Sequence, residues 1–342
     1  MLRQTKGNPM RLGFVGTGTM GGSMAGCLID AGHQLTVYDV RPEATAALHA
    51  SGARLAETPT AVASASEVVF TSLPGPYEVE AAVLDASSGI LAGLRAGGAY
   101  IDMTTNAPTV ARRVAEACRE RGVDMLDAPV SGRPPTMTVM VGGAEPVFAR
   151  YRPLLAAMAS NIFYVGAAGA GCTAKLVTQY LGYTNFVAAL EGMLIGAKAG
   201  IDLGVLAQIV PLSAGASRTF DNIPRSVLPG SFIAGGTLDI VAKDLQLACD
   251  LARAVAAPAH LGLLAHDVLS RAQAQGWGQE GFPVAARILE AMAGVELRAP
   301  VEGAAGYQTE DPRRLSRHSR EKGNPGTANA GGGGPGPPLP RG

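Results

Sequence analysis

The first half of the chain alternates short apolar runs with longer amphipathic stretches. Short apolar runs between polar breaks predict buried strands, and stretches such as 23–31 and 108–121 repeat apolar positions with a helical period. This alternation is typical of an α/β fold with a doubly wound parallel sheet. The predicted strands cover residues 11–15, 34–38, 68–73, 99–103, 124–128 and 138–141.

The pattern changes after Gly166. Residues 169–200 predict one long, largely apolar helix, and 239–256 and 284–294 predict two more. We therefore expect an all-helical C-terminal domain. Helices this apolar in a small domain indicate burial against another domain or subunit, so we expect a homodimer or homotetramer.

A glycine-rich turn follows the first predicted strand, with the spacing Gly16-x-Gly18-x-x-Gly21. Gly16 allows a tight turn, Gly18 leaves room for a pyrophosphate at the backbone, and Gly21 allows the next helix to pack closely on the sheet. The second predicted strand ends in Asp39, at about the 20-residue offset of an acid that binds ribose hydroxyls. The motif predicts a dinucleotide-binding Rossmann domain, in preference to a glycine-rich turn without a ligand.

Asp39 also bears on the choice of cofactor. A carboxylate accepts hydrogen bonds from a free 2′-hydroxyl and repels a 2′-phosphate, which favours NAD over NADP. Arg41 is either a solvated turn residue or a partner for that phosphate. NAD is therefore the expected cofactor, with NADP possible.

Two further loops are expected at the same edge of the sheet. The third strand runs into Leu73 and Pro74, and the fourth into a polar loop that contains Thr105. Ligands of open α/β sheets bind at the carboxyl ends of the strands, so both loops are placed to contact the cofactor. A helix N-cap is the alternative role for Thr105.

These patterns predict the domain organisation. Residues 10–165 form the NAD-binding Rossmann domain and residues 166–298 the helical substrate and oligomerisation domain. The first nine residues and the polar, then Gly- and Pro-rich segment 299–342 cannot bury a core, which predicts disorder.

Composition excludes several classes of protein. Lys and Arg total 28, as do Asp and Glu, so the balanced charge gives no reason to expect a nucleic-acid or anionic-membrane partner. No apolar run reaches the length that spans a bilayer, and no secretory signal precedes the first strand. The scattered cysteines fit reduced thiols in the cytoplasm, and the dispersed histidines predict no metal site.

Four blocks in this order make the chain resemble the β-hydroxyacid dehydrogenases, which include 3-hydroxyisobutyrate dehydrogenase and tartronate semialdehyde reductase and are 6-phosphogluconate dehydrogenase-like. The resemblance covers about Arg11–Arg298, and the blocks are residues 13–25, 127–132, 169–177 and 243–248. It implies an NAD(P)-dependent 3-hydroxyacid dehydrogenase that acts on CH–OH donors, interconverting a small 3-hydroxy acid with its oxo acid or semialdehyde by hydride transfer.

Lys175 is the candidate catalytic residue. Oxidation of a hydroxyl releases a proton with the hydride, and a lysine handles that proton near neutral pH if burial or a nearby cation lowers its pKa. Its apolar flanks favour burial over the alternative, a surface lysine at the head of a helix. The resemblance implies that Lys175 is the family's catalytic lysine.

The resemblance also implies roles for other residues. Gln179, on the same helical face as Lys175, and the turn at Ser131 and Gly132 would bind the substrate carboxylate or hydroxyl. Gln179 as an ordinary solvent-facing helix residue is the alternative. Lys243 would reach the nicotinamide, with Asp244 orienting its neighbours. The expected cofactor-binding residues are Gly16, Gly18, Thr19, Met20, Gly21, Asp39, Leu73, Pro74, Thr105 and Lys243.

Two departures from the family pattern leave the substrate open. The loop after Gly132 is shorter than in the family and contains Arg133, which either supplies a cation for an acidic substrate or caps the turn. Gly236 replaces an aromatic residue and opens space over the nicotinamide pocket. A tartronate- or succinic-type semialdehyde reductase is the alternative enzyme. An imine reductase is disfavoured, because relatives with that activity generally lack the lysine that this chain has at Lys175. A non-catalytic dinucleotide-binding protein is the alternative from another class.

Overall fold

The computed structural model describes residues 9–300. The predictions of disorder for residues 1–9 and 299–342 fall outside that range, apart from residues 9, 299 and 300.

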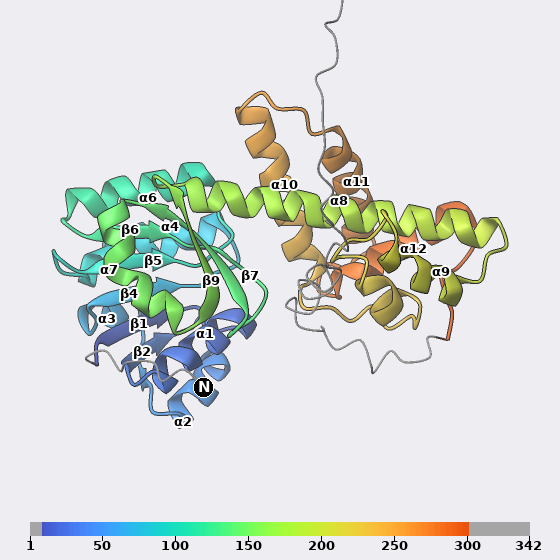
Figure 1. The fold of residues 1–342 in the computed structure, drawn as a ribbon. Coiled ribbons are helices and arrows are strands. Elements are labelled where there is room, and N and C mark those ends of the chain that lie inside the picture. The colour runs from blue at the N-terminus through green and yellow to red at the C-terminus, as the bar shows by residue number, and fades with distance from the viewer. Residues whose placement is uncertain (1–8, 301–342) are drawn as a thin grey trace, which may run out of the picture. The chain divides into compact units, whose positions relative to one another are not determined.

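Six parallel strands form the first part of the sheet (Figure 1). They pair in the order β3-β2-β1-β4-β5-β6, so the strand order reverses between β1 and β4. In open α/β sheets this reversal marks the place where ligands bind. The strands are β1 (Arg11–Val15), β2 (Gln34–Tyr38), β3 (Arg54–Leu55), β4 (Val68–Thr71), β5 (Ala99–Asp102) and β6 (Asp124–Asp127).

The sheet continues with the strand predicted at 138–141 and with two strands that were not predicted. These are β7 (Val130–Ser131), β8 (Met137–Gly143) and β9 (Ala159–Gly166). β8 runs antiparallel to β6 and β7 and parallel to β9. The predicted strand at 138–141 is confirmed as β8, but the expectation that it runs parallel to β6 was wrong, because the short connection from β6 lacks the dozen or more residues that a parallel crossover needs.

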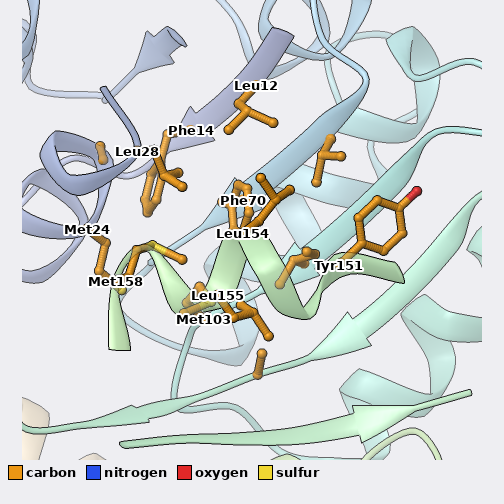
Figure 2. Packing of buried hydrophobic residues seen from close by; sticks show 14 of the residues in the cluster. Leu12, Phe14, Met24, Leu28, Phe70, Met103, Tyr151, Leu154, Leu155 and Met158 are labelled. Carbon is orange, nitrogen blue, oxygen red and sulfur yellow. The ribbon is translucent and has the colours of Figure 1, made fainter. Parts of the chain in front are cut away.

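Helices cover both faces of the sheet. They are α1 (Thr19–Asp30), η1 (Pro42–Thr45), α2 (Ala46–Ala50), α3 (Pro59–Ser64), α4 (Pro76–Leu84), α5 (Ile90–Gly93), α6 (Pro108–Glu120) and α7 (Glu145–Ala156). Figure 2 shows Met24 and Leu28 of α1 and Leu155 of α7 gathered near Phe14 and Phe70. A second cluster, on the other face, joins residues of α3, α4, α5 and α6. Alternate strand residues thus enter different cores, as a doubly wound sheet requires.

The remaining elements are helical. They are α8 (Ala170–Lys198), α9 (Leu203–Ile209), the short turns η2 (Val210–Leu212) and η3 (Ile223–Val227), α10 (Leu238–Ala254), α11 (His260–Ala274), η4 (Phe282–Ala285) and α12 (Ala286–Ala293). The long helix α8 contacts β8 and β9 and also packs against α10, α11 and α12. The helix predicted over 284–294 is a 3₁₀ turn followed by α12. Within residues 9–300, no helix combines the length and the apolar character needed to cross a membrane.

Candidate active site

The glycine turn lies between β1 and α1, where the strand order reverses. Gly16 has a φ of 85° and donates its N–H to the Tyr38 carbonyl oxygen at 2.9 Å. A Cβ on Gly21 would overlap the Gly16 carbonyl oxygen, so this glycine permits the close packing of α1 on the turn. Gly18 differs, because a Cβ there would meet only the Arg41 guanidinium, at 3.3 Å. The backbone is therefore open at Gly18, as a pyrophosphate requires.

Asp39 connects the end of β2 to this turn. Its Oδ2 accepts the Thr17 N–H at 2.8 Å, and its Oδ1 accepts the Arg41 N–H at 2.9 Å. The Arg41 Nε lies 3.7 Å from the same Oδ1. Asp39 thus holds the shape of the turn, a contribution that its predicted role with the ribose did not include. Thr19 and Met20 begin α1, whose first N–H groups have no partners within the helix and are suited to an anion.

The loops after β4 and β5 are bonded to each other. The Leu73 N–H donates to Thr104 Oγ1 at 3.0 Å, and Pro74 follows directly. Buried Asp102 accepts hydrogen bonds from Thr71 Oγ1 at 2.9 Å and from Asn106 Nδ2 at 3.0 Å. Burial raises the pKa of this carboxyl. Asp102 was missed from the sequence, although an acid at the end of an otherwise apolar strand is a usable signal.

Asp127, at the end of β6, fixes the start of α8. Its carboxylate accepts the Gly169 N–H at 2.7 Å and the Cys172 N–H at 2.8 Å. Burial raises the pKa of Asp127 in spite of these bonds. A Cβ on Gly171 would overlap the backbone oxygens of Met140 and Asp127, so a side chain there would push α8 away from the sheet. Since Lys175 lies on the next turn of α8, Asp127 positions the candidate catalytic residue.

A chain of polar contacts joins α8 to α10. Lys175 Nζ donates to Gln179 Oε1 at 2.9 Å. Gln179 Nε2 donates to Asp244 Oδ2 at 2.6 Å and to the Tyr183 hydroxyl at 2.8 Å. Lys243 Nζ lies 2.8 Å from Asp244 Oδ1, an ion pair outside the angles of a hydrogen bond. The predicted residues Lys175, Gln179 and Lys243 are thus brought together through Asp244.

Lys243 carries this chain to the cofactor loops. Its Nζ donates to the Thr105 carbonyl oxygen at 3.3 Å, and its side chain passes beside Gly75, after Pro74. The loops of the sheet and the polar residues of the helices therefore meet at one place. Tyr183 was missed from the sequence, although Lys175, Gln179 and Tyr183 are spaced four residues apart, which puts them on one helical face.

Burial changes the acid–base behaviour of Lys175. Only 6% of the residue is exposed, and this desolvation lowers its pKa to about 8. Asp244 raises the pKa and Lys243 lowers it, both with smaller effect. An amine with this pKa is present in both protonation states near neutral pH, which general acid–base catalysis requires.

The predicted carboxylate site is more exposed. Ser131 ends β7 and Gly132 follows with a φ of 83°. Both are exposed, and within residues 9–300 no hydrogen bond joins them to the Lys175 chain. The part of the chain that the structure describes holds no group of three His, Cys, Asp or Glu residues suited to a metal.

A cavity of about 990 Å³ lies at the opposite edge of the sheet. Arg11 and Val68, which begin β1 and β4, line it together with the turn at Gly97 and Gly98. Since ligands of open α/β sheets bind at the carboxyl edge, this cavity is separate from the candidate active site.

Two family models match the chain in succession. The NAD-binding domain of 6-phosphogluconate dehydrogenase matches residues 11–166. The NAD-binding domain of NADP-dependent 3-hydroxyisobutyrate dehydrogenase matches residues 169–289. These matches confirm the predicted nicotinamide dinucleotide cofactor, and Gly18 offers it an open backbone.

Curated proteins and solved structures give the same result. A 2-(hydroxymethyl)glutarate dehydrogenase of Eubacterium barkeri is 32% identical over 84% of this chain and 97% of its own length. A 3-hydroxyisobutyrate dehydrogenase of Pseudomonas aeruginosa is 36% identical over 76% of this chain and 91% of its own. A crystal structure of 3-hydroxyisobutyrate dehydrogenase from Salmonella typhimurium is 32% identical, with a TM-score of 0.75, over 82% of this chain and 99% of that one.

Proposed function

The chain belongs to the β-hydroxyacid dehydrogenase family of NAD(P)-dependent oxidoreductases, and from that premise we propose that it acts on a small 3-hydroxy acid with Lys175 as the acid–base group. Family membership favours an enzyme over a protein that binds a dinucleotide without turnover. The observation that carries the proposal is the buried Lys175 amine, with a pKa of about 8, held by Gln179 beside Lys243 and the cofactor loops.

The reaction divides into a hydride and a proton. The glycine turn at Gly16, Gly18 and Gly21 would hold NAD, which would supply the hydride acceptor for the carbinol carbon. The neutral Lys175 amine takes the hydroxyl proton as the carbonyl forms, and its ammonium returns that proton in the reverse reaction. Gln179 and Asp244 hold the Lys175 Nζ in place. Ser131 Oγ and the Gly132 N–H would bind the carboxylate, since exposed N–H groups in a turn suit an anion.

A semialdehyde reductase is the second candidate, with the same residues working in the opposite direction. The Lys175 pKa of about 8 supports this candidate, because at neutral pH most molecules then carry Lys175 as an ammonium that can donate a proton. Tartronate- or succinic-type semialdehydes are the substrates of this reading.

NADH formation with a panel of short hydroxy acids tests the proposal. The panel takes 3-hydroxyisobutyrate and 2-(hydroxymethyl)glutarate from the names of the relatives and adds simple 2-hydroxy acids as negative controls. Oxidation of a 3-hydroxy acid alone is the expected result. Silence across the panel, with NAD binding established by thermal shift, would contradict the proposed substrate class.

The preference for NAD is testable at Asp39. Asp39→Asn removes the charge that repels a 2′-phosphate and releases the Arg41 guanidinium to pair with it. The ratio of kcat/KM for NADP to that for NAD is expected to rise about tenfold, the value of one charge-assisted interaction. Asp30→Asn, at the far end of α1, is the matched control. An unchanged ratio in Asp39→Asn would mean that the ribose is bound elsewhere.

A homodimer or homotetramer is proposed on the basis of exposed apolar side chains on the helices. They include Leu181 and Ile195 of α8, and Leu261 and Leu264 of α11. Sedimentation is expected to give a multiple of the chain mass of 34.8 kDa, and Leu264→Glu is expected to lower that mass. Leu55→Glu, on β3, is the control for an added charge. A monomeric wild-type protein would contradict the proposal.

The remaining features of the proposal concern organisation and location. We place the NAD-binding domain at residues 10–165 and the helical domain at 166–298, supported by the break between the two family models. All four cysteines are free thiols, which supports a cytoplasmic protein. The balance of 28 basic and 28 acidic residues supports small molecules, rather than nucleic acid or a membrane surface, as its partners.

A further inference from the structure

Arg133 lies at the tip of a short hairpin beside the proposed carboxylate site. β7 and β8 pair through Val130 with Val139 and Ser131 with Thr138. The turn of the hairpin therefore lies between Ser131 and Thr138 and contains Gly132 and Arg133. Thr136 Oγ1 donates to the Arg133 carbonyl oxygen at 3.4 Å, inside the same turn. The backbone of Arg133 is therefore held, while its side chain is exposed.

The Arg133 guanidinium reaches the segment that leads into α10. Its Nη2 lies 3.7 Å from the position that a Cβ on Gly235 would take. A Cβ on Gly236 would meet nothing closer than Val241, at 3.8 Å. Two adjacent glycines thus leave space for a ligand next to the guanidinium. None of the ion pairs formed within residues 9–300 includes Arg133.

The segment opposite Arg133 is itself fixed in place. Phe232 adopts a φ of 50°, and its ring lies under the Arg287 guanidinium at 4.7 Å and the Arg298 guanidinium at 5.1 Å. Further along, the Gly236 carbonyl oxygen accepts the Phe282 N–H at 3.1 Å. The segment opposite Arg133 is therefore anchored on both sides of Gly235.

The same segment is connected to the proposed catalytic residue. The Phe282 ring packs edge-on against Tyr183, with 5.9 Å between ring centres. The Tyr183 hydroxyl accepts from Gln179, which in turn accepts from Lys175. The segment beside Arg133 is thus linked through Phe282 and Tyr183 to the proposed acid–base group.

We propose that Arg133 binds a second carboxylate of the substrate, and that the substrate class is a dicarboxylic acid bearing a hydroxymethyl group. One carboxylate would lie at Ser131 and Gly132, with the carbinol at Lys175. The other carboxylate would pair with the Arg133 guanidinium. A planar guanidinium suits this task because it binds a carboxylate through two parallel hydrogen bonds. This inference rests on the function proposed above.

The test compares dicarboxylates with monocarboxylates of similar shape. The hydroxymethyl derivatives of malonate, succinate and glutarate are each paired with the analogue in which a methyl group replaces the distal carboxylate. For at least one length, the wild-type kcat/KM is expected to favour the dicarboxylate. In Arg133→Gln that ratio is expected to fall about 10- to 100-fold, the effect of losing a hydrogen bond to a charged group.

Two further variants separate a specific effect from a general one. Arg133→Lys keeps the charge and loses the planar guanidinium that forms two parallel hydrogen bonds. Its kcat/KM ratio for dicarboxylate over analogue is therefore expected to lie between those of the wild type and Arg133→Gln. Arg152→Gln removes an exposed arginine of α7 and is expected to leave the ratio unchanged. A wild-type enzyme that prefers the monocarboxylate analogue at every length, or a ratio unchanged in Arg133→Gln, would overturn the inference.

A binding measurement distinguishes this inference from the proposed reaction. Malonate, succinate and glutarate lack the hydroxymethyl group, and in the presence of NAD at least one is expected to raise the Tm of the wild type more than that of Arg133→Gln. Stabilisation that depends on Arg133, without turnover of any hydroxy acid, would retain the anion site and reject the proposed reaction. Turnover of monocarboxylic hydroxy acids, without any effect of Arg133 in either assay, would retain the reaction and reject the inference.

Discussion

Replacement of Lys175 by methionine is expected to lower kcat for hydroxy-acid oxidation by about 10²–10⁴-fold, the usual contribution of an acid–base group. Methionine retains the length and most of the volume of the buried side chain, so the packing of α8 is preserved. The affinity for NAD is expected to survive, because the cofactor loops lie on other elements. Stopped-flow and steady-state NADH formation, together with titration of NAD, measure both effects.

The same helix offers a matched control. Lys198 is exposed near the end of α8 and donates to the Ala293 carbonyl oxygen, at 3.1 Å. Lys198→Met is expected to retain wild-type kcat. Near-normal turnover in Lys175→Met would mean that another group moves the proton.

Gly18→Val is expected to weaken NAD binding about 10- to 100-fold, equivalent to one charge-assisted hydrogen bond to the pyrophosphate. The backbone at Gly18 tolerates a Cβ, because the nearest atom to it is the flexible end of Arg41 and the φ of Gly18 is −60°. The valine instead occupies the space that the phosphates need. Calorimetric titration with NAD measures the loss, and an unchanged Tm without NAD shows that the fold is intact.

Gly26→Ala provides the control on the same helix. A Cβ at Gly26 meets nothing within 4 Å, so this variant is expected to bind NAD as the wild type does. If Gly18→Val bound NAD normally, the pyrophosphate would not lie at this turn.

The extent to which sequence predicted the fold depended on how local the signal was. The helix predicted over 169–200 is observed as Ala170–Lys198, because Gly169 and Gly200, both with positive φ, bound it. The predicted helix began at Ser23, whereas α1 begins at Thr19. Gly21 and Gly22 have low helix propensity, and only close packing on the turn makes them helical.

Other elements were missed for different reasons. The edge strand β9 has an exposed run at Phe163, Tyr164 and Val165, so it lacks the buried alternation that identified the other strands. The helix α11 does carry a helical pattern of buried residues, and its omission was an error of interpretation rather than a missing signal. The pattern consists of Ala265, Val268, Leu269 and Ala272.

In the candidate site, too, contacts within one helix were predictable from the sequence, whereas contacts between helices were not. The spacing of Lys175 and Gln179 placed them on one face of a helix, and the structure joins them by a hydrogen bond. The bond from Gln179 to Asp244 crosses 65 positions of sequence and depends on how α8 packs against α10. No local pattern encodes that packing, so the geometry of the polar chain required the structure.

The most direct test of the central claim is the pH dependence of kcat/KM for hydroxy-acid oxidation, measured as NADH formation. The base is the neutral amine of Lys175, whose fraction grows as pH rises through its pKa of about 8. In the oxidising direction the rate is therefore expected to climb through a midpoint near pH 8 and then level off, and in the reducing direction it is expected to decline over the same range. The residual activity of Lys175→Met is expected to lack that midpoint. A wild-type profile without it, or the same midpoint in Lys175→Met, would contradict the assignment of Lys175 as the acid–base group.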